Sequence, residues 1–279
     1  MSNTIVVPRD MIWINDKPAI CNLAASDVEY KQDCVDISDV RYNAGLCSRY
    51  ELDKIHLDVD PKLISKHKYV KVRCTDHIFR KFEDREANIH KSVSDCNNYG
   101  MFQEVEHAKR PFEFTTLCED RAAIIYKYMN MSASFALDYA CNTGYFTRFF
   151  SRLGIKAHGV DRSAGSIQLA SEITKHAHLN TTYEKSDNLR ACLDKKTYDI
   201  VLLLGILHDI SYSKELLDSL VRCVEMQIII QIEGTQYEWI NNILRTNMFD
   251  ENVKIKHIGN HNSPLIVINK KSNEEIKGS

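Results

Sequence analysis

Apolar residues in the second half of the chain gather in short runs, and segments with helical periodicity separate these runs. The run at 198–204 is almost continuously apolar, which is typical of a strand buried on both faces of a parallel sheet. The alternation of strands and helices from 117 to 250 predicts an open, doubly wound α/β sheet. Strands are expected at 135–139, 156–161, 181–186, 198–204 and 227–233, and helices at 117–129, 148–153, 164–178, 214–225 and 237–245.

Two further apolar segments close this pattern. Residues 253–258 and 265–268 flank a turn at Asn262-Ser263-Pro264, and strands joined by a short turn pair antiparallel. We therefore expect a mostly parallel sheet with an antiparallel C-terminal hairpin in one domain, residues 111–270. The charged tail, 271–279, is predicted to be disordered.

The first 110 residues follow a different pattern, in which short apolar patches alternate with polar stretches. Residues 11–14 and 69–72 have the alternation of strands, and the charged segment 78–93 predicts an exposed helix. Glycine and proline are scarce here, so the element boundaries are poorly marked. We expect a smaller, mixed α/β region over residues 1–110.

Composition narrows the class of protein. The chain has 279 residues, 44% of them hydrophobic, which is enough for a substantial core. A formal net charge of −2 provides no global basic field that would attract nucleic acid. The nine cysteines are odd in number and lack paired spacing, as expected for reduced thiols in a cytoplasmic protein. No apolar run approaches the roughly 20 residues of a membrane span, and the start does not resemble a signal peptide.

Cys74 and His77 are close enough in sequence to bind one metal ion. A structural zinc site needs about four ligands, usually in two close pairs, and no second pair lies nearby. We therefore predict no metal site.

Acidic residues stand at the ends of two predicted strands. Asp138 precedes a turn of small residues, and Asp161 follows it by 23 positions. A second strand's carboxylate meets the ribose hydroxyls of a bound nucleoside at a spacing of about 20 residues. Because the carboxyl ends of parallel strands meet at one edge of a sheet, we expect one pocket for a nucleoside-like ligand there.

These segments resemble the motifs of the class I S-adenosylmethionine-dependent methyltransferases, over about residues 115–270. Residues 137–146 (LDYACNTGYF) resemble the first motif, 159–161 the second, 186–188 the third and 198–208 the fourth. Ala140 and Asn142 stand where glycines are common in that family, and the full G-x-G-x-x-G of a dinucleotide-binding enzyme is missing. The resemblance implies a Rossmann-like fold and S-adenosylmethionine, with S-adenosylhomocysteine as product.

The resemblance also implies roles for individual residues. Asp161 would bind the ribose hydroxyls, Asp187 and Asn188 would contact the adenine edge, and the loop 138–144 would lie beside the methionine portion. Two alternatives stay open: Asp161 as a helix cap, and Asp187 as an ordinary acid of a polar loop. The implied cofactor-binding residues are Asp138, Ala140, Cys141, Asn142, Gly144, Phe146, Asp161, Arg162, Asp187, Asn188, Leu204 and Gly205.

By the same resemblance, residues 205–210 lie between the cofactor and the acceptor. Transfer to a hydroxyl oxygen usually needs a base, and histidine suits that role near neutral pH. His208 is therefore the candidate base, Asp209 is its candidate orienting group, and Glu233 is a candidate contact to the acceptor or the cofactor amine. A structural role for His208 is the alternative.

The acceptor is suggested by a looser resemblance to methyltransferases of surface-glycan biosynthesis, including the methyltransferase part of O-antigen chain-terminating enzymes. The strand ending at Glu233 and the turn at 263–265 carry it. It implies transfer to a sugar hydroxyl or phosphate oxygen, with residues 1–110 binding or capping the acceptor. Two alternatives remain: an RNA-modifying methyltransferase, because basic and aromatic residues mix at 66–85, and an inactive methyltransferase fold that only binds ligands.

Overall fold

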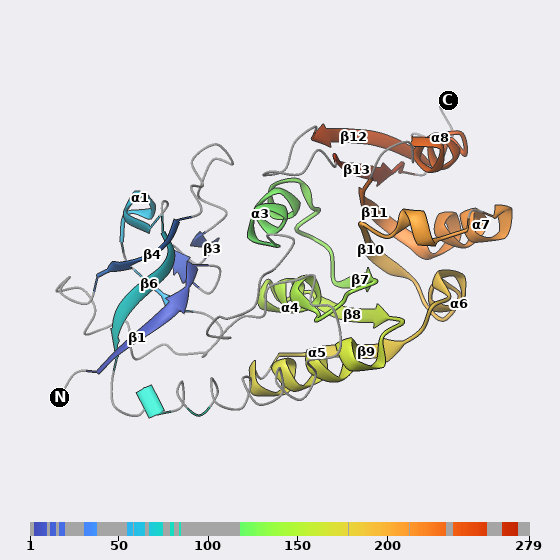
Figure 1. Cartoon of the computed structure of the whole chain (residues 1–279). Helices are drawn as coiled ribbons and strands as arrows, with labels where there is room; N and C mark the ends of the chain where they lie inside the picture. Colours follow the sequence, from blue (N-terminus) through green and yellow to red (C-terminus); the bar gives the residue numbers. More distant parts are fainter. Residues whose placement is uncertain are drawn as a thin grey trace. The chain divides into compact units, whose positions relative to one another are not determined.

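Seven strands from the second half of the chain form one sheet in the computed structural model (Figure 1). Their order is β12-β13-β11-β10-β7-β8-β9, and the five from β11 to β9 run parallel. β13 is antiparallel to both β11 and β12. The strands are β7 (Phe135–Tyr139), β8 (Lys156–Asp161), β9 (Thr181–Lys185), β10 (Tyr198–Leu204), β11 (Val224–Gln231), β12 (Phe249–Ile255) and β13 (Leu265–Lys270).

This topology confirms the predicted doubly wound sheet with its antiparallel hairpin. From β7 the chain winds outward through β8 and β9 on one side, then returns to build β10 and β11 on the other. The strand order therefore reverses between β7 and β10. Ligands of such sheets bind beyond the carboxyl ends of the strands at this reversal.

The structure describes residues 3–9, 12–14, 17–19, 31–37, 55–57, 59–64, 67–74, 79–80, 84, 118–177, 179–211, 213–232, 237–255 and 264–272. They fall into two compact units: 1–127 with 172–178, and 128–171 with 179–279. Residues 273–279 of the predicted tail (271–279) and most of the predicted helix at 78–93 lie outside the described residues.

Helices cover both faces of the large sheet. In Figure 1, α4 (Tyr145–Arg152) and α5 (Ala164–Ala177) lie on one face, and α6 (Leu189–Leu193), α7 (Lys214–Cys223) and α8 (Tyr237–Leu244) lie on the other. The short α6 was not expected from periodicity, since it has little more than one turn. Its start is specified locally, because the Asn188 side chain accepts a hydrogen bond from Ala191 N at 3.0 Å.

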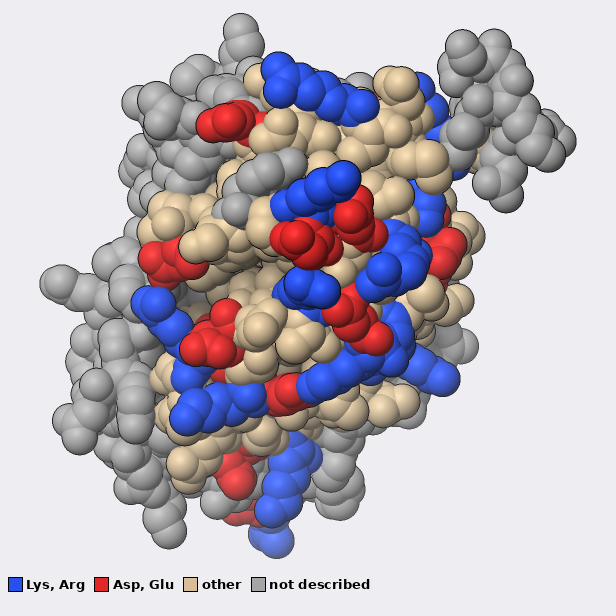
Figure 2. Space-filling model, turned by 90° about the vertical axis from the view of Figure 1, so that its right-hand side faces the viewer, with Lys and Arg blue, Asp and Glu red and all other residues tan. Residues whose placement is uncertain are grey.

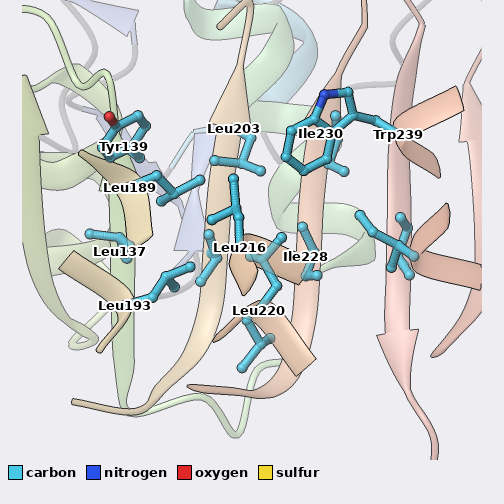
Figure 3. Close-up of a cluster of buried hydrophobic side chains, with 14 of the residues drawn as sticks. Leu137, Tyr139, Leu189, Leu193, Leu203, Leu216, Leu220, Ile228, Ile230 and Trp239 are labelled. Atoms are coloured by element: carbon cyan, nitrogen blue, oxygen red, sulfur yellow. The ribbon is translucent and has the colours of Figure 1, made fainter. Parts of the chain in front are cut away.

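The core between the sheet and α6–α8 explains the apolar runs (Figure 3). Leucines and isoleucines of β7, β10 and β11 meet the apolar faces of the three helices there. Ile200 to Leu203 are 0% exposed, as expected for a strand covered on both faces. The labelled residues of this core are Leu137, Tyr139, Leu189, Leu193, Leu203, Leu216, Leu220, Ile228, Ile230 and Trp239.

The smaller unit contains two three-stranded sheets. One has the order β1-β6-β4 and the other β3-β2-β5. Val70 and Val72 of β6 are buried, while Lys71 between them pairs with Asp36 at 2.8 Å, which confirms the predicted alternation. The elements are β1 (Asn3–Pro8), β2 (Ile12–Ile14), β3 (Lys17–Pro18), β4 (Lys31–Asp36), β5 (Ile55–His56), α1 (Pro61–Ile64), β6 (His67–Cys74) and α3 (Cys118–Tyr128).

Two kinds of feature are absent from the described residues. None of the helices there is long and apolar enough to cross a membrane. In the same residues, no group of three or more His, Cys, Asp or Glu side chains is placed to bind a metal ion. His77, of the Cys74–His77 pair, lies outside them.

Candidate functional site

The predicted site residues converge on the carboxyl edge of the large sheet. β10, β7, β8 and β9 are consecutive strands there, so residues far apart in sequence follow neighbouring strand ends. Glu233 lies outside the described residues. The strand ends, and the loops and turns that follow them, carry Asp138, Ala140, Cys141, Asn142, Gly144, Asp161, Arg162, Asp187, Asn188, Leu204, Gly205, His208 and Asp209.

The loop after β7 adopts an unusual backbone conformation. Ala140, Asn142 and Gly144 all have positive φ, at 62°, 49° and 79°. The left-handed region costs a non-glycine residue roughly 1–2 kcal/mol, so Ala140 and Asn142 are strained. Cys141 holds the loop by donating its N–H to Val160 O at 2.9 Å and accepting from Gly144 N at 2.8 Å. Strain held in this way is typical of ligand-binding loops.

Asp161 ties this loop to β8. Its Oδ2 accepts a hydrogen bond from Asn142 N, and its Oδ1 accepts one from Ser163 N, both at 2.8 Å. The cap of α5 is Ser163, whose hydroxyl accepts from Ser166 N at 3.2 Å. Ser163, rather than Asp161, therefore caps α5. Each carboxylate oxygen retains a second lone pair that can accept from a ligand hydroxyl.

Two residues of the first turn of α4 form hydrogen bonds to the end of β7 and to the loop after it. Thr147 donates its hydroxyl to Oδ2 of the buried Asp138 at 2.7 Å. Arg148 is fully buried and donates to Thr143 O at 2.5 Å. Sequence reasoning missed both residues, because an arginine in a helix is usually exposed and nothing in the pattern marks this one as buried.

Tyr183 of β9 is a third residue that the sequence did not mark. A Cβ atom on Gly144 would lie 2.6 Å from the Tyr183 hydroxyl oxygen, and one on Gly159 would lie 2.6 Å from its ring. The ring therefore packs directly on both glycines. Gly144 is required for this contact as well as for its left-handed backbone.

Two polar atoms of the loop bear on its chemistry. Burial raises the pKa of the Cys141 thiol well above its usual value, and the nearby carboxylates of Asp138 and Asp161 raise it further. The thiol is therefore protonated and is not a nucleophile. The side-chain oxygen of Asn142 is buried without a hydrogen-bond partner. A buried orphan acceptor is costly, so it suits a ligand that donates a hydrogen bond there.

The segment after β9 carries Asp187 and Asn188, which are predicted to contact the adenine edge. Burial raises the pKa of Tyr139 to about 12, and Cys192, Asp187 and Asp161 add to this effect, so the phenol stays neutral. Asp187 is exposed, and Asn188 uses its side-chain oxygen to cap α6. Phe146 is fully buried against Tyr145, with ring centroids 5.2 Å apart, in the packing of α4.

The turn after β10 carries the candidate catalytic groups. Gly205 has φ 66°, and the 3₁₀ turn η6 (Leu207–Asp209) follows it. His208 is half-exposed, and its Nε2 lies 3.6 Å from Asp209 Oδ1. The other oxygen of Asp209 pairs with Arg162 at 3.2 Å. A half-exposed imidazole beside a carboxylate can accept a proton from an approaching hydroxyl.

The part of the chain that forms this edge is similar to known proteins. Residues 136–227, from β7 into β11, match the family model described as a methyltransferase domain. A search of curated proteins gave no match. The crystal structure of WbdD aligns with a TM-score of 0.52 and 14% identity, over 64% of this chain and 46% of that one. Magnesium protoporphyrin IX methyltransferase (ChlM) from Synechocystis PCC 6803 with bound SAM aligns with a TM-score of 0.48 and 13% identity, over 68% and 97%.

Proposed function

From the premise that the chain carries a class I S-adenosylmethionine-dependent methyltransferase domain, we propose that it moves a methyl group to an oxygen atom of a small or glycan-linked acceptor. The acceptor atom is a sugar hydroxyl or a phosphate oxygen. The biological role that follows is a step of surface polysaccharide biosynthesis in the cytoplasm.

The residues at the carboxyl edge fit this cofactor. The orphan Asn142 oxygen accepts from a hydroxyl or ammonium group, and Asp161 has spare lone pairs for the ribose hydroxyls. Ala140, Asn142 and Gly144 have positive φ, and strained backbone of this kind is typical of ligand-binding loops. When bound, S-adenosylmethionine supplies a methyl group activated by its sulfonium centre.

The pair of His208 and Asp209 carries the proposal of oxygen transfer. An acceptor hydroxyl must lose its proton as the new bond to carbon forms, and His208 presents a half-exposed ring nitrogen that takes it. Asp209, whose Oδ1 lies 3.6 Å from Nε2 of His208, orients the imidazole in this proposal. The turn follows β10, which borders β7 at the reversal of strand order, and this position supports the proposal that His208 faces the acceptor.

The glycan acceptor rests on sequence resemblance rather than on a contact. The strand ending at Ile232-Glu233 and the turn at 263–265 resemble the surface-glycan methyltransferases. Residues 1–110 supply the acceptor-binding or capping region in this proposal.

Calorimetry and a rate assay test the proposal together. S-adenosylhomocysteine should bind the wild-type protein, and a panel of sugars and phosphate-ended glycans should contain an acceptor whose oxygen is methylated. On that acceptor, His208→Ala should lower kcat by at least about a hundredfold, because general bases contribute about 10²–10⁴-fold. His158→Gln, a histidine away from this edge, is the control and should keep its rate.

Two results would count against the proposal. A near-normal rate for His208→Ala would make His208 structural. Methylation of nitrogen or carbon acceptors, with no oxygen acceptor found, would reject the acceptor class while leaving the cofactor unchanged.

A further inference from the structure

An ion pair crosses the carboxyl edge of the sheet between two strands that are not neighbours. Arg162, the first residue after β8, places Nη1 3.2 Å from Oδ2 of Asp209 in the turn after β10. β7 lies between these strands. Since adjacent strands are about 4.8 Å apart, the pair bridges the end of β7, where the sheet order reverses and the cofactor is held.

Both ends of this bridge are anchored in the backbone. On the β8 side, Asp161 is fixed by hydrogen bonds from Asn142 N and Ser163 N, so the chain at Arg162 is held on both flanks. On the β10 side, Asp209 donates its N–H to Ile206 O at 2.9 Å within its turn. The ion pair therefore connects two defined loops.

Asp209 extends the connection to the candidate base. One carboxylate oxygen faces Arg162 and the other lies 3.6 Å from Nε2 of His208. The backbone joins Asp161, on the ribose side, to Arg162. The ion pair between Arg162 and Asp209 then continues this connection to His208, on the acceptor side.

Folding stability does not account for this arrangement. The Arg162 side chain is 72% exposed and that of Asp209 35% exposed. Exposed ion pairs contribute little to stability. What distinguishes this pair from others on the surface is its position across the ligand-binding edge.

We propose that Arg162 is a positioning residue that couples occupancy of the cofactor site to the orientation of His208, acting through Asp209. A ligand hydroxyl that donates to Asp161 uses the same carboxylate that holds Asn142 N and Ser163 N. That change passes to the neighbouring Arg162, and through its ion pair to the turn at 207–209. The inference rests on the proposed function, because it takes His208 as the base facing the acceptor.

Histidine NMR on the full chain tests this coupling directly. The His208 imidazole signal is assigned by its loss in His208→Gln, and S-adenosylhomocysteine is then titrated. The ligand should shift the His208 signal in the wild type. In Arg162→Ala the shift should disappear at a ligand concentration that calorimetry on the same variant shows to be saturating.

Two further variants control the experiment. Arg162→Lys should restore part of the shift, because an ammonium group also pairs with Asp209 although it lacks the planar fork of arginine. Arg222→Ala removes an exposed arginine that pairs with Asp194 from the last turn of α7, at the opposite edge of the sheet, where β11 begins. It should respond to the ligand like the wild type.

The outcomes separate this inference from the proposed function. A ligand-induced shift of His208 that is equal in Arg162→Ala and wild type, or absent from the wild type, would overturn the coupling. Oxygen methylation that needs His208 would still support the proposed function in that case. Conversely, a shift that depends on Arg162 supports the coupling even if no oxygen acceptor is methylated.

Discussion

The Asp161 carboxylate holds the loop after β7 and is also the proposed contact to the ribose. Its hydrogen bonds to Asn142 N and Ser163 N hold the strained loop against β8, and each oxygen retains a lone pair for the proposed ribose contact. At 9% exposure it is nearly buried, so an unmatched polar contact there is costly. Loss of this side chain therefore affects both the shape of the loop and the proposed ribose contact.

Asp161→Ala should weaken the binding of S-adenosylhomocysteine by about 1–3 kcal/mol, the cost of leaving a buried partner unsatisfied. Isothermal titration calorimetry measures the change. Asp218→Ala removes an exposed acid on α7 and should leave the affinity unchanged. Equal affinity of Asp161→Ala and wild type would contradict the ribose assignment.

At the scale of elements, the junction of β7, α4 and β9 depends on a glycine. Gly144 begins α4 with φ 79°, and the ring of Tyr183 occupies the space where a side chain would lie. Gly154, just beyond α4, has a similar φ of 85°, but no atom lies within 4 Å of the position that a Cβ would take there. A comparison of alanine substitutions at the two glycines therefore distinguishes the cost of the left-handed backbone from the cost of overlap with Tyr183.

Gly154→Ala should lower the free energy of unfolding by about 1–2 kcal/mol, the cost of a left-handed conformation for alanine. Gly144→Ala should lower it by about 1–3 kcal/mol more, because overpacking against Tyr183 adds to the same strain. Urea unfolding measures both. Equal losses in the two variants would show that Tyr183 moves aside at no cost.

The pairing of β8 with β9 contains a buried histidine. His158 Nδ1 lies 2.7 Å from Thr182 Oγ1 on the facing strand. Burial lowers the pKa of His158 below 6.5, the charge of Lys196 lowers it further, and Glu184 acts in the opposite direction. The folded protein therefore holds this imidazole neutral at a pH where the unfolded chain binds a proton.

This difference predicts a stability change with pH. As the pH falls below about 6.5, the unfolded chain takes up a proton at His158 that the folded protein does not, so the free energy of unfolding decreases. His158→Gln lacks this contribution and should lose less stability between pH 7.5 and 5.5. Urea unfolding at both values compares the two proteins. An equal loss in both would mean that His158 titrates alike in the folded and unfolded states.

At the scale of the whole molecule, the charges are mixed in sign. The face over α6 to α8 in Figure 2 shows acidic and basic side chains interleaved. The ion pairs of the described residues include Asp194 with Arg190 and Arg222, and Lys195 with Glu184. In the smaller unit, Lys71 pairs with Asp36. Together with a formal net charge of −2, the interleaved charges of the described residues on the face shown in Figure 2 offer no single-sign patch of the kind that binds nucleic acid.

We therefore expect no strong, salt-dependent binding of RNA. Fluorescence anisotropy with a labelled single strand at 50 and 200 mM salt checks this, since six to ten phosphate contacts would lose about 10³–10⁵-fold in affinity over that range. S-adenosylhomocysteine affinity should be nearly flat over the same range. Tight RNA binding that falls steeply with salt and weakens in Lys71→Ala would favour the RNA-modifying alternative.

Much of this protein was predictable from sequence because the relevant signals are local. The continuous apolar run at 198–204 predicted a central strand, and Asp138 and Asp161 marked two strand ends. The resemblance built on them predicted a methyltransferase domain and its fold, which the family match over residues 136–227 and the topology confirm. The assignments of single residues to ligand atoms remain predictions.

Between residues 117 and 268, the order and type of the helices and strands, apart from the short α6, and the clustering of strand-end residues were determined by the sequence alone, because periodicity and strand polarity need only neighbouring residues. The tertiary structure decided which side chains fill the spaces between elements. Buried Arg148 behind the loop, Tyr183 over Gly144 and the Arg162–Asp209 bridge all join segments from different elements. Such contacts depend on packing in three dimensions, which no local pattern records.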